Sequence, residues 1–94
     1  MDNKEQELAK IRKDLKEMIV RELSLEDINP VDIKDNEVLF GEGLGLDSLD
    51  AVEIVVLLER NFGLEVKNME QGKEIFHSIN TIANFVYDNK KKVS

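Results

Sequence analysis

The chain has 94 residues, no cysteine and a formal net charge of −7. This length supports one hydrophobic core and leaves little room for a deep enzyme cleft, so we expect a single domain over residues 1–94 that is not an enzyme. The negative charge disfavours nucleic acid and anionic membranes as partners and favours basic proteins. No apolar run approaches the roughly 18 residues of a membrane-spanning helix, so no membrane insertion is expected. The absence of cysteine excludes disulfides and fits a cytoplasmic protein, which we expect to be a monomer.

The first predicted element is an amphipathic helix of about five turns. Asn3 is its candidate N-cap, with Gln6 three residues later. Its apolar residues recur at spacings of three and four: Leu8, Ile11, Leu15, Met18, Ile19 and Leu23. Asn29-Pro30 breaks any helix, and a long loop is predicted over residues 30–46. Apolar side chains in this loop are expected to attach it to the core: Val31, Ile33, Val38, Leu39 and Phe40.

The second predicted helix begins after Asp47, its N-cap, and ends at Phe62 before Gly63. A short third helix is predicted near residues 69–76. Ser78 or Asn80 would cap the last helix, whose apolar stripe consists of Ile79, Ile82, Ala83, Phe85 and Val86. The predicted fold is therefore all-α: a small four-helix bundle of three longer helices and one short one, with a long loop between the first and second helices. Residues 1–3 and 89–94 are expected to fray.

The second helix is apolar on two sides. With about 100° of rotation per residue, one stripe is assigned to the core: Ala51, Ile54, Val55, Leu58 and Phe62. Leu49, Val52 and Val56 fall on the opposite side, where Glu53 and Glu59 flank them. Either the loop or the short helix covers this second stripe, or a basic partner docks on it. Seven acids and no basic residue lie between residues 35 and 59, which favours docking.

The glycine-rich segment before Ser48 raises several kinds of chemistry. Residues 41–45 read G-x-G-x-G and not G-x-G-x-x-G, with no Lys-Ser/Thr and no βαβ unit, which disfavours a phosphate-binding loop. Ser48 is not in a G-x-S-x-G motif, and His77 is the only histidine, so a serine hydrolase is disfavoured. No calcium-loop spacing is present, and no metal site is predicted.

A fourth interpretation is that Ser48 is itself modified. It would be the first residue of the helix, where a phosphodiester meets the positive end of the helix dipole and free backbone N–H groups. An ordinary helix-initiating serine explains the same position, so position alone does not decide between the two.

The residues themselves carry a resemblance. FGEGLGLDSLDAVEI (residues 40–54) and LERNFGLEV (residues 58–66) resemble the signature of acyl carrier proteins. The resemblance implies a four-helix bundle in which a phosphopantetheinyl transferase attaches 4′-phosphopantetheine to Ser48. It also implies that Asp47 supports the transferase's magnesium ion. The arm would hold acyl groups as thioesters for enzymes of fatty acid, lipid or polyketide-type biosynthesis.

Further residues take roles from the same resemblance. Positions that match the surface on which partner enzymes dock their basic patches are Leu49, Asp50, Val52, Glu53, Val56 and Glu59. The expected acyl pocket consists of Phe40, Ile54, Leu58 and Phe76. Gly43 stands where the family usually has an acid, Arg60 where the commonest fatty-acid carriers tend to have one, and residues 67–75 lack the usual proline. These departures favour a specialised carrier. A carrier of aminoacyl or D-alanyl groups, and a non-carrying acidic interaction subunit of the same fold, stay open as alternatives.

Overall fold

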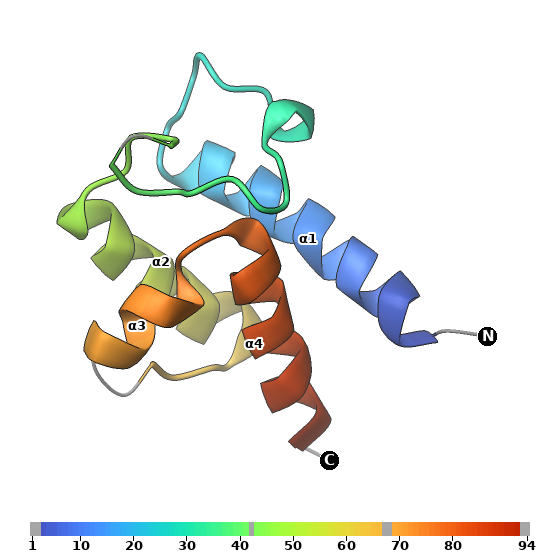
Figure 1. Ribbon diagram of the computed structural model, residues 1–94. Coiled ribbons are helices and arrows are strands. Elements are labelled where there is room, and N and C mark those ends of the chain that lie inside the picture. The colour runs from blue at the N-terminus through green and yellow to red at the C-terminus, as the bar shows by residue number, and fades with distance from the viewer. Residues whose placement is uncertain (1–2, 42, 67–68, 93–94) are drawn as a thin grey trace.

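A computed structural model describes residues 3–41, 43–66 and 69–92, and this part of the chain is all-α (Figure 1). Its elements are α1 (Asn3–Glu22), the 3₁₀ helix η1 (Pro30–Asp32), α2 (Ser48–Phe62), α3 (Met69–Ile75) and α4 (Ile79–Lys92). The prediction of a small helical bundle with one short helix and a long loop is confirmed. Of the ends expected to fray, residues 3 and 89–92 are helical, whereas residues 1–2 and 93–94 lie outside the described residues.

The core forms because each long helix buries one apolar stripe. In α1 the buried residues are the predicted ones up to Ile19, while Leu23 lies just beyond the helix and is half-buried. α4 packs directly against α1. Its apolar stripe is buried except for Phe85, which is partly exposed. No helix in the described residues is long and apolar enough to cross a lipid bilayer.

Local capping sets where α4 begins. The Thr81 backbone N–H donates to Ser78 Oγ over 3.2 Å, and the Ser78 N–H donates to Thr81 Oγ1 over 2.9 Å. Burial of Ser78 carries no penalty for unsatisfied polar atoms, because this reciprocal pair of hydrogen bonds satisfies them. Of the two predicted caps, the structure uses Ser78, and Asn80 lies inside the helix.

Ion pairs and backbone hydrogen bonds attach the long loop to the bundle. Asp35 accepts from Lys16 Nζ at 2.7 Å and lies 3.6 Å from Arg12 Nε, which ties the loop to α1. The Asp35 carbonyl also accepts the Asn80 N–H at 2.8 Å, which ties the same residue to α4. Figure 1 shows the loop crossing the end of the bundle at which α2 and α4 begin.

The apolar loop residues do not all contribute to the core. Ile33 and Leu39 are buried, and Phe40 is half-buried, as predicted. Val31 is 81% exposed and Val38 is 41% exposed, so the prediction that they attach the loop to the core is wrong. Val31 is the middle residue of a single 3₁₀ turn, and the chain turns inward only afterwards, at Ile33.

Candidate functional site

The start of α2 is fixed by two aspartates. Asp47 has an extended backbone, and its Oδ1 accepts the N–H groups of Leu49 at 3.0 Å and Asp50 at 3.2 Å. Asp50 Oδ2 in turn accepts the Asp47 N–H at 3.0 Å. This capping box satisfies donors that a helix start otherwise leaves unpaired. It makes Ser48 the first residue of the helix, with an exposed side chain.

The capping box changes one expectation about this site. The Leu49 and Asp50 amides already donate to Asp47, so these two are not among the free backbone N–H groups that were expected to meet a phosphodiester. The positive end of the helix dipole still favours an anion on Ser48. Both hydrogen bonds end on Oδ1 of Asp47, so the cap does not use Oδ2.

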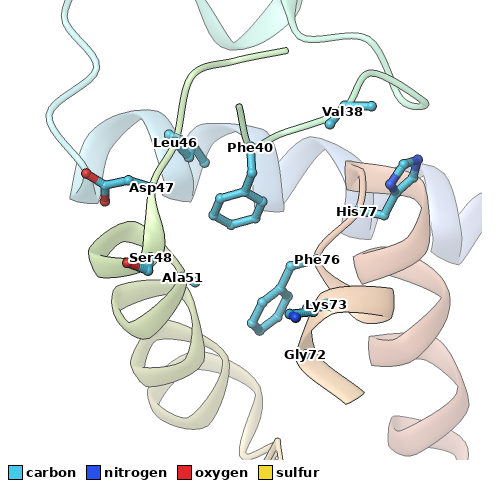
Figure 2. Close-up of a pocket in the computed structure, with 10 residues that line it drawn as sticks. All are labelled: Val38, Phe40, Leu46, Asp47, Ser48, Ala51, Gly72, Lys73, Phe76 and His77. Carbon is cyan, nitrogen blue, oxygen red and sulfur yellow. The ribbon is translucent and has the colours of Figure 1, made fainter. Parts of the chain in front are cut away.

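Ser48 lies on the rim of a pocket of about 420 Å³ (Figure 2). Its walls are formed by three loop residues (Val38, Phe40 and Leu46), the start of α2, α3 and the turn before α4. Leu46, Ala51, Gly72 and Phe76 are buried and form a mostly apolar floor. The complete lining is Val38, Phe40, Leu46, Asp47, Ser48, Ala51, Gly72, Lys73, Phe76 and His77.

The pocket coincides with only part of the expected acyl pocket. Phe40 and Phe76 line it, and their rings point into it in Figure 2. Ile54 and Leu58 are fully buried in the core and do not line this pocket. Ile54 lies one turn and Leu58 two turns after Ala51, so both are further along α2 from Ser48 than the helix residues that line the pocket.

Sequence reasoning missed most of the remaining lining. Ala51 on α2 and Gly72 on α3 are small residues at facing positions. Their small size was the sequence feature that could have predicted a space between these helices. His77 is exposed and lies in the turn before α4. Its carbonyl accepts the Leu39 N–H at 3.0 Å, so this turn also positions the loop.

We expect Gly72→Ala to raise the stability of the protein by up to about 1 kcal/mol, because alanine is the better helix former. An added Cβ would lie 3.6 Å from Phe76 Cε2 and 3.7 Å from Val66 Cγ1, which are ordinary contacts. Urea unfolding measures the change. Gly63→Ala is the opposite control, because Gly63 has φ +68° and a side chain there is strained. A Gly72→Ala protein less stable than wild type would show that the space at α3 is tighter than described.

The second stripe of α2 is uncovered. Leu49 is 78%, Val52 54% and Val56 40% exposed, so neither the loop nor α3 covers them. Of the acids around this stripe, Glu59 is exposed, whereas Asp50 and Glu53 are half-buried. α2 therefore presents an apolar strip with an acidic border to solvent, beginning beside Ser48.

Comparison with known proteins now adds to this geometry. The family model described as "Phosphopantetheine attachment site" matches residues 13–86, a range that contains Ser48 and the whole pocket. The chain belongs to this family. It is also similar to an acyl carrier protein of Wolinella succinogenes, with 36% identity over 77 residues, which cover 82% of this chain and 93% of that protein. An acyl carrier protein of Sulfurovum sp. is 42% identical over 53 residues, 56% of this chain and 65% of that protein.

The family match confirms the resemblance to acyl carrier proteins and assigns 4′-phosphopantetheine as the cofactor. The described residues fit this group. Ser48 offers an exposed hydroxyl at the positive end of α2, and a mostly apolar pocket opens beside it. Acyl carrier proteins in general work with phosphopantetheinyl transferases and with enzymes that act on acyl groups.

Proposed function

We propose that this protein carries acyl intermediates as thioesters on a 4′-phosphopantetheine arm attached to Ser48. It presents them to enzymes of fatty acid, lipid or polyketide-type biosynthesis. The observation that carries the proposal is the placement of Ser48. Its hydroxyl is exposed at the capped start of α2 and on the rim of the pocket.

Attachment requires Ser48 to act as a nucleophile toward coenzyme A in the active site of a transferase. Ser48 Oγ passes its proton to a base of the transferase and forms a bond to the phosphorus of coenzyme A nearest the pantetheine, while the bond from that phosphorus to the leaving 3′,5′-ADP breaks. The exposure of Ser48 lets the transferase reach it. Asp47 Oδ2, which the cap does not use, is the oxygen we assign to support of the transferase's magnesium ion. The chain has no cysteine, so the arm supplies the only thiol for a thioester.

The exposed strip of α2 and the pocket serve different steps after the arm has been attached. The exposed strip of Leu49, Val52 and Val56 gives partners an apolar contact, and its acidic border attracts basic patches. Such docking is salt-sensitive and weak enough for the carrier to leave after each reaction. The pocket lined by Phe40 and Phe76 shelters an acyl chain between reactions.

Intact-mass measurement tests attachment directly. The purified chain is incubated with a phosphopantetheinyl transferase, coenzyme A and magnesium. We expect one added phosphopantetheine on the wild type and none on Ser48→Ala. Ser24→Ala, which removes another exposed serine, should load like the wild type. An unmodified wild type would favour the non-carrying interaction subunit over a carrier, and a loaded Ser48→Ala would show that the arm is attached to a residue other than Ser48.

A further inference from the structure

The pocket beside Ser48 has two chemically different sides. Asp47 and Ser48 lie on the α2 side, whereas Lys73 and His77 lie across from them on α3 and the following turn (Figure 2). The ring of Phe76 lies between Ser48 and Lys73 in this view. All four polar side chains are exposed at the rim.

Lys73 gives the far side of the rim a positive charge. Among the described residues that line the pocket, it is the only Lys or Arg. The ion pairs among the described side chains use Arg12, Lys16 and Arg21, and none of them involves Lys73.

The phosphodiester of the arm does not account for this charge, since it would be bonded to Ser48 on the opposite side, beside Asp47. A group held at Lys73 is instead part of what occupies the pocket. An occupant that lies on the apolar floor and ends at Lys73 has a methylene segment followed by an anionic end. A purely hydrocarbon chain would leave the Lys73 ammonium to water.

We propose that the pocket favours acyl groups whose far end is a carboxylate, which pairs with Lys73. This inference rests on the proposed function, because the acyl group reaches the pocket on the arm of Ser48. It names the class of cargo: monothioesters of dicarboxylic acids long enough to cross the floor. The enzymes that supply this cargo would activate one carboxyl group of a dicarboxylic acid or elongate a chain that already carries one.

The test compares matched pairs of cargo on the full chain. A phosphopantetheinyl transferase loads Ser48 from hexanoyl-, hexanedioyl-, octanoyl- or octanedioyl-coenzyme A, and intact mass verifies each product. Thermal unfolding then gives the difference in melting temperature between the dicarboxylic and monocarboxylic forms. The same difference is measured in Lys73→Met, which removes the charge and keeps a long side chain. Lys13→Met is the control, because Lys13 is an exposed lysine on α1.

We compare the melting temperature of the dicarboxylic form minus that of the monocarboxylic form in each protein. For at least one chain length, we expect this difference to be about 2–5 °C larger in the wild type than in Lys73→Met, which is the effect of one partly exposed ion pair in a small domain. Lys13→Met should behave like the wild type, and about 1 M salt should reduce the effect. Equal differences in wild type and Lys73→Met, or the same loss in Lys13→Met, would overturn the proposal and leave Lys73 a solvated lysine. If Lys73→Met does not fold, Lys73→Gln gives the same comparison. Failure of every cargo to load would instead refute the proposed function.

Discussion

Truncating Leu58 to alanine is expected to destabilise the protein by about 2–5 kcal/mol, whereas the same truncation at Leu49 should change stability by less than about 0.5 kcal/mol. The two leucines lie on one helix, but Leu58 is fully buried and Leu49 is 78% exposed. Removing Leu58 leaves a cavity in the core. The whole free energy of unfolding of a domain of this size is only roughly 5 kcal/mol or somewhat more. Urea unfolding followed by circular dichroism measures both changes.

Leu58→Ala and Leu49→Ala also distinguish a loss of folding from a loss of partner docking. If the exposed stripe of α2 is where partners bind, Leu49→Ala should lower the efficiency with which a transferase loads Ser48, by about tenfold for a central apolar contact. Its fold should stay intact, so the loss lies in recognition. Unchanged loading by Leu49→Ala, together with unchanged binding of acyl-transferring partners, would contradict the assignment of this stripe as the docking surface.

Gly43→Ala is expected to have the second large effect, a destabilisation of about 2–4 kcal/mol. A Cβ added at Gly43 would overlap the Val38 carbonyl, which accepts the Leu44 N–H at 3.0 Å. The backbone has to move, and Val38 and Phe40 of the pocket lining move with it. The acid that the family usually has at this position would meet the same carbonyl, so the departure of this chain from the family pattern has a steric reason.

Gly41→Ala is the matched control for this loop. Nothing lies within 4 Å of a Cβ added at Gly41, and only its φ of +67° opposes a side chain. That strain costs about 1–2 kcal/mol, so Gly41→Ala should be the milder of the two changes. Thermal unfolding of both variants gives the order. A Gly43→Ala protein as stable as the wild type would show that the loop before Ser48 has a different path.

Features of α2 were predictable from the sequence because they are local. Asp47 and Asp50 form a cap within four residues, and Gly63 ends the helix with φ +68°. The two apolar faces follow from helical periodicity alone, which placed Leu49, Val52 and Val56 away from the core. The position of Ser48 at the start of the helix follows from the same local rules.

The loop and the pocket were not predictable in this way, because distant residues form them. Leu39 is positioned by a hydrogen bond to the carbonyl of His77, and Phe40 forms a single parallel bridge with Leu46. Such backbone contacts leave no period in the sequence. Lys73 reaches the pocket rim only because α3 lies across the pocket from the start of α2, and no pattern within α3 itself indicates this.

The intact mass of the protein purified from its own host, followed by fragmentation to locate the modification, tests the carrier function most directly. We expect a fraction of the molecules to carry one phosphopantetheine on Ser48, with or without an acyl group that the same spectrum identifies. A population that is entirely unmodified in growing cells, or an arm located on any residue other than Ser48, would contradict the function proposed here.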